Sequence, residues 1–309
     1  MKYKDWVSEW LSDYVKPAVK EKTFMNYEGI MRIHVLPTLG EYELEELSLA
    51  VLQAFVLALG RRGNTRTGEG LAAGTVGMVV AVVQKSLRSA VQMERTAVQY
   101  SDGIKRPRPE GRDTTCFSLA EQKRIEAEVL RSPRSKNIGI LICLYTGMRI
   151  GELMALRWDD IDFEQGIIRV SSTCRDGIRD GRTVKIIDSP KTFCSRRKIP
   201  IPIQIIPYLY QHKRCSRSEF VICSRTGDIS VRGYQKGFSS MLLRLGIEHK
   251  SFHSLRHPFA TRALECGMDV KTLSEILGHK SPTVTLNRYA HSMTEHKIAM
   301  MNRVGSFLQ

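Results

Sequence analysis

The sequence predicts a mainly α-helical protein with a small antiparallel β-sheet, an α+β arrangement in two domains. The length of 309 residues favours about two domains. Helical patterns dominate the chain, whereas the runs typical of strands are confined to residues 167–202. Between the two halves, the stretch DGIKRPRPEGRDTT is rich in proline, glycine and positive charge, which is typical of a linker that cannot bury a core.

Residues 1–103 are predicted to form a compact bundle of about four helices. Start and stop signals mark most of these helices. In order, they are a helix carrying Trp6, Trp10, Leu11 and Tyr14; a helix capped by Thr23 that ends before Pro37 and Gly40; a helix capped by Ser48 that ends at Gly60; and a helix opened by Thr75, apolar on one side and basic on the other.

Residues 104–113 are predicted to link the two domains. Lys105, Arg106 and Arg108 lie in this segment, and a basic linker can follow the backbone of a duplex. We therefore expect the protein to close around DNA as a C-shaped clamp, with these three side chains as DNA contacts. For any single basic residue of the first domain, an ordinary solvated surface position is the competing interpretation.

Residues 114–309 are predicted to form the second domain. It begins with a capping-box pattern at Ser118, followed by a buried helix that ends at Gly147 and a short helix over RIGELMALRW. The runs IIRVSST, TVKIIDSP and RRKIPIP are the predicted strands, and the last two flank the polar stretch KTFCS as a hairpin. The remainder, from RGYQKGFSSMLLRLG onward, is predicted to be helical.

The composition points to a polyanionic partner and a reducing compartment. Lysine and arginine total 47 against 32 acidic residues, a formal net charge of +15, which favours contact with nucleic-acid phosphates. Ribosomal association or an anionic membrane surface would also fit this charge. No apolar run approaches the length of about 20 residues that spans a bilayer, and the N-terminus lacks the apolar core of a signal peptide. The seven cysteines include no C-x-x-C pair, which argues against disulfides and structural zinc. We expect a cytoplasmic protein.

Four stretches of the second domain carry residue types that bind or cleave a phosphodiester. In TGMRIGELMALRW, Arg149 follows a helix-ending glycine, and Glu152 can orient its guanidinium; alone, Arg149 would be a capping arginine and Glu152 a surface acid. In SFHSLRHPFATRALECG, His253 and Arg256 are three residues apart at a predicted helix start. They therefore share a face, at a helix end that attracts anions.

The other two stretches supply a lysine, a histidine and a tyrosine. Lys191 lies at the predicted hairpin turn in SPKTFCSRRKIP, where a lysine is usually only solvated, and Lys185 and Lys198 compete for any role. In LGHKSPTVTLNRYAH, His279 follows a glycine and Tyr289 arrives near the end of the next predicted helix. A buried structural aromatic is the competing interpretation of Tyr289.

These motifs, in this order, resemble those of the tyrosine recombinases, the phage integrase family. The resemblance rests on TGMRIGELMALRW, PKT, HSLRHPFAT, LGHKSPTVT and YAH, and TFMNYEGIMRIHVLPTLG resembles the family's core-binding domain, so nearly the whole chain is covered. The chain is most similar in style to integrases of phages and conjugative transposons of Gram-positive bacteria. The resemblance implies a helical core-binding domain followed by a tyrosine-recombinase catalytic domain.

Pro258 departs from the family's pattern, which usually has a small hydroxyl residue at this position. If Ser254 is the N-cap of the helix, Pro258 removes the first helical N–H bond. This departure puts the local geometry in question, but not the presence of His253 or Arg256.

The resemblance also implies a role for each site residue. Tyr289 is the nucleophile, Arg149 and Arg256 grip the scissile phosphate, Lys191 is the general acid, His253 and His279 support proton transfer and hydrogen-bond the phosphate, and Glu152 supports Arg149. No cofactor and no metal are expected, because fixed cationic donors can stabilise the charge on the equatorial oxygens during phosphoryl transfer, and because the bond energy is retained in the phosphotyrosine.

The implied activity is site-specific DNA recombination, which cuts and rejoins strands through a 3′-phosphotyrosine intermediate to integrate or excise a mobile element. The expected partners are double-stranded DNA recombination sites, further copies of the chain in a homotetramer on DNA, and directionality or DNA-bending accessory proteins, with no membrane. The expected location is the bacterial cytoplasm, in association with the nucleoid. A type IB topoisomerase-like enzyme and a catalytically silent DNA-binding accessory protein are the alternatives.

Overall fold

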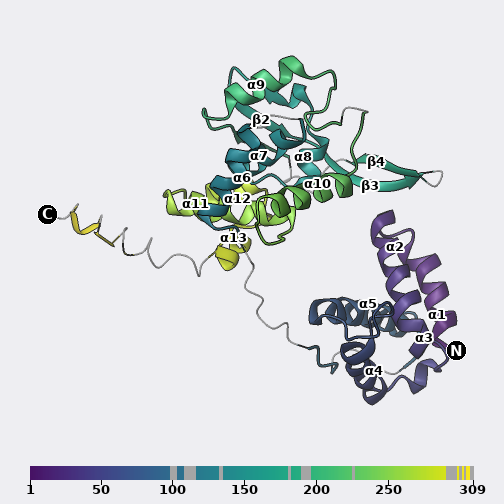
Figure 1. Ribbon diagram of the computed structural model, residues 1–309. Helices are drawn as coiled ribbons and strands as arrows, with labels where there is room; N and C mark the ends of the chain where they lie inside the picture. Colours follow the sequence, from purple (N-terminus) through teal and green to yellow (C-terminus); the bar gives the residue numbers. More distant parts are fainter. Residues whose placement is uncertain are drawn as a thin grey trace. The chain divides into compact units, whose positions relative to one another are not determined.

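The chain forms two compact units, Met1–Asp113 and Thr114–Gln309, in a computed structural model. Both units are drawn in Figure 1. The structure describes residues 1–97, 103–107, 116–131, 135–179, 182–188, 196–224, 227–289, 298, 301–302 and 304–306. The described chain is mainly helical with small antiparallel sheets, so the predicted fold class is confirmed.

The first unit is a helical bundle packed around two tryptophans. Trp6 and Trp10 are almost completely buried, and the indole N–H of Trp6 donates to the hydroxyl of Ser86 at 3.1 Å, so the polar atom of a buried aromatic ring has a partner. The helical segments are α1 (Tyr3–Glu9) with a π-helical continuation at Trp10–Val15, α2 (Glu21–Ile30) with a π-helical continuation at Met31–Val35, α3 (Leu36–Leu39), a 3-10 turn at Leu44–Glu46, α4 (Leu49–Arg62) and α5 (Ala73–Gln92).

The limits of these helices differ from the predicted ones at several points. The cap at Ser48 is confirmed, since its hydroxyl accepts a backbone N–H of the first turn of α4. Thr23 and Thr75 lie inside α2 and α5, which begin earlier, and α4 continues past Gly60. Pro37 does not end the helical path, because it occupies the first turn of α3, where its missing N–H would have no intrahelical partner.

The first residues of the predicted linker pack on the first unit. Ile104 is buried in that unit's core. The backbone N–H of Lys105 donates to the side-chain oxygen of Gln53 at 2.9 Å, and the side-chain nitrogen of Gln53 donates back to the carbonyl of Lys105 at 3.2 Å. The guanidinium of Arg106 donates to Gln84 on α5. The chain therefore leaves the first unit only after these residues.

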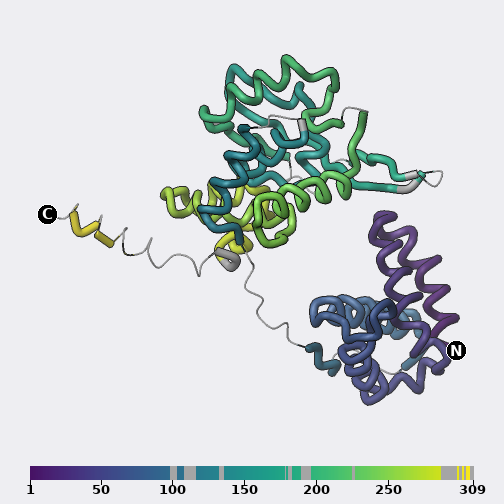
Figure 2. Tube along the Cα trace, viewed as in Figure 1, coloured from purple at the N-terminus to yellow at the C-terminus, as the bar shows by residue number. Residues whose placement is uncertain are grey.

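The second unit combines helices with a three-stranded antiparallel sheet in the order β1-β2-β5 and a separate hairpin of β3 and β4. Figure 2 follows this path along the chain from teal to yellow. The elements are α6 (Leu119–Arg131), α7 (Ser135–Thr146), α8 (Ile150–Ala155), a 3-10 turn (Trp158–Asp160), β1 (Ile161–Asp162), β2 (Ile167–Val170), β3 (Thr173–Arg179), β4 (Arg182–Asp188), β5 (Arg197–Pro200), α9 (Ile206–Cys215), α10 (Val231–Arg244), a 3-10 turn (Phe252–Leu255), α11 (Arg256–Glu265), α12 (Val270–Leu277) and α13 (Pro282–Tyr289).

The predicted pairing of the strands on either side of KTFCS is wrong. β4 pairs with β3, in a register that places Arg179 opposite Arg182, and β5 pairs with β2, with Ile199 opposite Ile168. In the sequence, β3 and β4 are separated by an Asp-Gly pair, the connection that most favours a tight two-residue hairpin. That local signal is stronger than the one at KTFCS, which lies between β4 and β5 and outside the described residues.

Packing within the second unit brings its candidate site elements together. α11 packs against α7, and α12 packs against both β5 and α13. Leu273 and Leu277 on α12 are fully buried and belong to one apolar cluster with Ala260 on α11. The end of α7, the starts of α8 and α11, the start of β5 and the end of α12 therefore meet at one place.

Candidate active site

Arg149 projects from the short loop between α7 and α8. Gly147 ends α7 with φ of +63°, and a Cβ at that position would come within 2.5 Å of the ring of Phe259, so only glycine fits this turn. Arg149 is the residue before α8, and its guanidinium donates from Nη1 to Glu152 Oε1 and from Nη2 to the carbonyl of Gly278, each at 3.0 Å. Its side chain remains 36% exposed. The guanidinium is therefore held at two points and still accessible.

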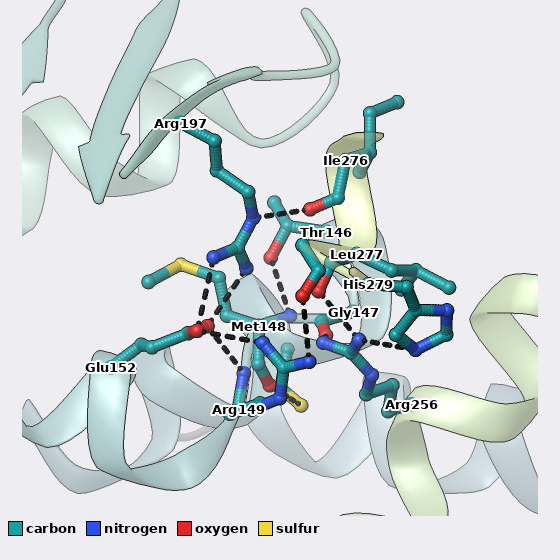
Figure 3. A network of polar contacts seen from close by, with 12 residues as sticks. Thr146, Gly147, Met148, Arg149, Glu152, Arg197, Arg256, Ile276, Leu277 and His279 are labelled. Carbon is teal, nitrogen blue, oxygen red and sulfur yellow. Dashed lines mark hydrogen bonds and ion pairs between the residues drawn. The ribbon is translucent and has the colours of Figure 1, made fainter. Parts of the chain in front are cut away.

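Arg256 is the first residue of α11 and is almost completely buried, with 2% exposure. Its Nη1 donates to the carbonyl of Gly147 at 2.8 Å, and its Nη2 donates to the carbonyl of Leu277 at 2.6 Å. Arg149 and Arg256 therefore attach to the adjacent carbonyls of Gly278 and Leu277, at the turn where α12 ends. Figure 3 shows both guanidinium groups converging on this turn.

His279 joins the same cluster from the end of the turn. Gly278 has φ of +64° and ends α12, which directs His279 back toward Arg256, where its Nε2 lies 3.0 Å from Nη2. A guanidinium can only donate, so we assign Nε2 as an acceptor and place the ring proton on Nδ1. Nδ1 lies 2.7 Å from the hydroxyl of Thr285, which is fully buried on α13. This arrangement corresponds to a neutral imidazole.

Glu152 is the acid at the centre of the network. Its side chain is only 7% exposed, and burial by itself would raise its pKa. The hydrogen bonds and charge of Arg197, together with the charge of Arg149, outweigh that effect and hold the pKa of Glu152 below its ordinary value. Glu152 is therefore ionised at neutral pH, in contact with two arginines.

Arg197 is a further member of the site, and the sequence motifs did not predict it. It donates from Nη1 and Nη2 to the two oxygens of Glu152 at 3.0 and 2.8 Å, with its own side chain 6% exposed. A signal for this residue is present in RRKIPIP. Arg197 is two positions from the buried Ile199 on β5, so strand alternation places it on the inward face, where a cation needs a partner.

His253 lies in the 3-10 turn directly before α11. Its ring is exposed and lies edge-to-face against that of His257, with centroids 5.5 Å apart. Ser254 is not the N-cap of α11, since Leu255 occupies that position. Pro258 is therefore the third residue of the helix, within the first turn, where a missing N–H is tolerated.

Two of the three general-acid candidates, Lys185 and Lys198, differ in burial. Lys191, between β4 and β5, lies outside the described residues. Arg108, in the linker, also lies outside them. Lys185 has a side chain that is 4% exposed, with its ammonium 3.6 Å from the ring centroid of Phe220. Burial lowers the pKa of Lys185, and the structure encloses it away from solvent. Lys198 is exposed on β5.

Tyr289 is the last residue of α13, and the structure describes its backbone but not its side chain. The nearest rivals as nucleophile are engaged elsewhere. The hydroxyl of Tyr145 donates to Glu126, and burial together with that carboxylate raises the pKa of Tyr145 to about 12. Tyr234 is 3% exposed and donates to the carbonyl of Lys136 at 2.7 Å. Neither hydroxyl belongs to the arginine cluster, which consists of Arg149, Arg197 and Arg256 around Glu152.

The described residues contain neither a cluster of metal ligands nor a membrane span. No three or more histidine, cysteine, aspartate or glutamate side chains of that part of the chain gather where they could hold a metal ion. None of its helices combines the length and apolar character needed to cross a bilayer.

Comparison with known families identifies the chain. A model of the phage integrase family matches residues 120–296, and a model of the phage integrase N-terminal SAM-like domain matches residues 2–59. The chain belongs to the phage integrase family. The tyrosine recombinase resemblance in its motifs is thereby confirmed, and the arginine cluster lies in the part of this integrase that matches the larger model.

Relatives of this integrase include recombinases and transposases of bacteria. A XerC-like tyrosine recombinase of Caldanaerobacter subterraneus is 30% identical over 322 residues, which cover 95% of this chain and 80% of the relative. The transposase of transposon Tn916 from Enterococcus faecalis is 31% identical over 188 residues, which cover 55% of this chain and 46% of the transposase. The chain thus spans most of the first relative and less than half of the second.

Solved structures with the same fold are integrases in complex with DNA. The Tn1549 transposon integrase with a circular intermediate DNA has a TM-score of 0.84 at 22% identity, over 98% of this chain and 99% of that one. The lambda integrase tetramer bound to a Holliday junction has a TM-score of 0.70 at 19% identity, over 93% and 77% of the two chains. At these identities the similarity establishes a shared fold.

Proposed function

We propose that this integrase cuts and rejoins double-stranded DNA at specific sites through a 3′-phosphotyrosine intermediate, and so integrates or excises a mobile element. The observation that supports this most is the convergence of Arg149, Arg256 and His279 on one turn, directly before the helix that ends at Tyr289. Two planar guanidinium groups and an imidazole at one point suit the non-bridging oxygens of a single phosphate.

In the proposed cleavage step, the Tyr289 hydroxyl oxygen attacks the scissile phosphorus. The bond from phosphorus to the 5′ oxygen breaks, which leaves a 3′-phosphotyrosyl ester and a free 5′-hydroxyl. Lys191 donates the proton that the departing oxygen needs. A 5′-hydroxyl of the partner strand then attacks the ester and releases Tyr289. Because the ester retains the bond energy, rejoining needs no nucleotide cofactor.

The arginines act on the charge that develops during this transfer. Negative charge accumulates on the equatorial oxygens, and donors that are already fixed in position stabilise it without reorganisation. Arg149 and Arg256 are fixed in this way by the carbonyls of Gly278, Gly147 and Leu277. We assign both to the grip on the phosphate and Glu152 to the support of Arg149.

The two histidines serve proton transfer in this proposal. Tyrosine has an ordinary pKa of about 10, so Tyr289 must lose its proton during attack. His279 can accept a proton on Nε2 once the hydrogen bond from Arg256 to that atom is released. His253, one turn ahead of Arg256, is assigned to the phosphate and to the same proton transfer.

We further propose a division of labour along the chain. Residues 1–103 bind the core of the recombination site, residues 104–113 follow the duplex backbone, and residues 114–309 carry out catalysis. The match of the SAM-like domain model to residues 2–59 supports DNA binding by the first unit. The net charge of +15 of the whole chain supports a polyanionic partner. Double-stranded recombination sites are the proposed substrate, which would place the protein with the nucleoid in the bacterial cytoplasm.

The assembly proposed on DNA is a homotetramer, joined in the cell by directionality or DNA-bending accessory proteins. Exchange between two duplexes requires four cleavages, and each protomer supplies one Tyr289. The lambda integrase tetramer on a Holliday junction supports this stoichiometry.

Ile298, Met301 and Val304 are exposed at helical spacing, and we propose that they dock on a neighbouring protomer. Deletion of residues 295–309 should then abolish recombination and leave binding to a single site intact, whereas normal recombination would refute the docking.

The proposed reaction is tested by Tyr289→Phe on a nicked suicide duplex. The wild-type protein should form a covalent adduct that survives denaturing electrophoresis, and mass spectrometry should locate the DNA on Tyr289. The variant should bind the same site without forming an adduct. Tyr145→Phe and Tyr234→Phe are the matched controls and should retain it. Absence of a wild-type adduct would favour a silent DNA-binding protein, and relaxation of supercoils without a defined site would favour a topoisomerase-like enzyme.

A further inference from the structure

Arg197 is a nearly buried cation that connects three elements of the candidate active site. It begins β5, its two Nη atoms reach Glu152 on α8, and its Nε donates to the carbonyl of Ile276 near the end of α12 at 2.5 Å. Figure 3 shows the guanidinium between the glutamate and this carbonyl. All three donor nitrogens of the side chain are therefore used for contacts inside the site.

Glu152 transmits the position of Arg197 to Arg149. Its Oε1 accepts from both Arg197 and Arg149 at 3.0 Å, and its Oε2 accepts from Arg197 at 2.8 Å and from the backbone N–H of Arg149 at 3.0 Å. Each oxygen is thus shared between the two arginines. A carboxylate held by a bidentate guanidinium has a defined plane, so Arg197 determines where Glu152 can receive Arg149.

The second contact of Arg149 also depends on Arg197. Arg149 donates to the carbonyl of Gly278, and a Cβ on Gly278 would lie 3.0 Å from Nη1 and 3.2 Å from Cζ of Arg197. The Arg197 side chain therefore packs directly against the backbone of this turn and bonds to the nearby carbonyl of Ile276. Arg197 therefore contacts both groups that hold the Arg149 guanidinium, which are the carboxylate of Glu152 and the backbone at Gly278.

Stability alone does not account for this arrangement. A buried ion pair loses solvation that its attraction only partly restores, and apolar replacements are often as stable. Here a second arginine is held beside the first on the same carboxylate, which adds repulsion between like charges. The arrangement fits a requirement for Arg149 geometry better than a requirement for stability, since displacement of a catalytic group by about 1 Å can slow a reaction about 10²-fold.

We propose that Arg197 is a positioning residue for DNA cleavage, which holds Glu152 and the turn after α12 so that the Arg149 guanidinium faces the scissile phosphate. The proposal rests on the function proposed above, in which Arg149 compensates the charge of that phosphate. Arg197 itself touches no reacting atom.

The test compares two suicide substrates that differ only at the scissile group, a phosphodiester and a methylphosphonate. The methylphosphonate has a methyl group in place of one non-bridging oxygen and carries no charge, so its cleavage depends less on a cation. Arg149→Ala should slow phosphodiester cleavage about 10²–10³-fold and methylphosphonate cleavage far less. Arg197→Met should slow phosphodiester cleavage about 10–100-fold and show the same preference for the methylphosphonate. The double variant should be no slower than Arg149→Ala.

Lys250→Met is the matched control for loss of a buried ion pair. The Lys250 side chain is 8% exposed, and its ammonium lies 2.7 Å from both oxygens of Glu121, outside the arginine network. This variant should leave the ratio of the two cleavage rates unchanged. If Arg197→Met does not fold, Arg197→Lys serves in its place, because one ammonium cannot reproduce the bidentate contact.

The possible outcomes distinguish the positioning role proposed for Arg197 from the role proposed for Arg149 at the phosphate. If Arg197→Met slows both substrates equally, or if its effect multiplies with that of Arg149→Ala, the residue is structural and the positioning proposal is wrong. If Arg149→Ala is itself not relieved by the methylphosphonate, then the role proposed for Arg149 is wrong and the positioning proposal falls with it. Relief in both variants, without additivity, supports both.

Discussion

Arg149 and Arg256 share a proposed task, yet their replacement should have different effects on folding. In Arg149→Ala, the carbonyl of Gly278 loses a donor and Glu152 loses the contact with Arg149 Nη1, while Glu152 keeps both of its bonds to Arg197. In Arg256→Ala, the carbonyls of two buried residues, Gly147 and Leu277, lose their donors, and a side chain that is almost completely buried is removed. We expect both variants to lose cleavage, and Arg256→Ala also to lose much of its stability.

The size of the stability difference between the two variants follows from these contacts. Leaving a buried polar group without its partner costs about 1–3 kcal/mol. The one carbonyl left without a donor in Arg149→Ala therefore lowers the stability by about 1–3 kcal/mol, and the two carbonyls in Arg256→Ala lower it by about 2–6 kcal/mol. Removing two buried methylenes of Arg256 adds about 2 kcal/mol. Relief of repulsion among the neighbouring cations reduces this difference. We therefore expect the free energies of unfolding of the two variants to differ by about 3 kcal/mol. For a domain of roughly 200 residues, this corresponds to a gap in Tm of about 6–12 °C.

Scanning calorimetry of the full chain measures this difference. The two units are expected to unfold separately, and Lys250→Met marks the transition of the second unit, because its ion pair with Glu121 lies within that unit. Cleavage of the suicide duplex by Arg149→Ala and Arg256→Ala, assayed below both transitions, should fall about 10²–10³-fold in each case. Equal stability of the two variants, or a lower Tm for Arg149→Ala, would refute the reasoning from burial.

Three further predictions concern the general acid, the linker and the central glutamate. Lys191→Ala should be rescued by a substrate with sulfur as the leaving atom, which departs without protonation; if the rescued variant is another lysine of the strand region, the assignment is wrong. Neutralising Lys105, Arg106 and Arg108 together should reduce the log–log salt slope of DNA binding by about 0.9 for each phosphate that is no longer neutralised, and an unchanged slope would exclude the clamp. Because the pKa of Glu152 is held below its ordinary value of 4.5, its stabilising contribution is present above that pH and is lost as the pH falls through the folded value. The stability advantage of the wild-type protein over Glu152→Gln, measured by denaturant unfolding, should therefore shrink in acid; an advantage that stays constant down to strongly acidic pH would contradict the ionised pair.

The sequence by itself determined the features that depend on neighbouring residues. Gly147 before Arg149 predicts a helix end followed by a projecting side chain, and the structure has that turn with positive φ. The capping box at Ser118 is confirmed, with Glu121 and Ser118 bonded reciprocally. Part of the order of helices and strands in the second unit was also predictable, because spacing and propensity act over a few residues, but β3 and α9 were not predicted.

Only the tertiary structure decided which distant residues meet. Arg149 and Gly278 are 129 positions apart, and Arg197 and Glu152 are 45 positions apart. The sequence pattern marks Arg197 as one basic residue among several in a strand, and it does not distinguish the burial of Arg256 from the exposure of Arg149. Those properties arise when β5, α8, α11 and α12 pack on one core. Short-range preferences select the conformation of each segment, whereas burial and ion pairing depend on which other segments cover it, and that is settled only by the packing of the whole unit.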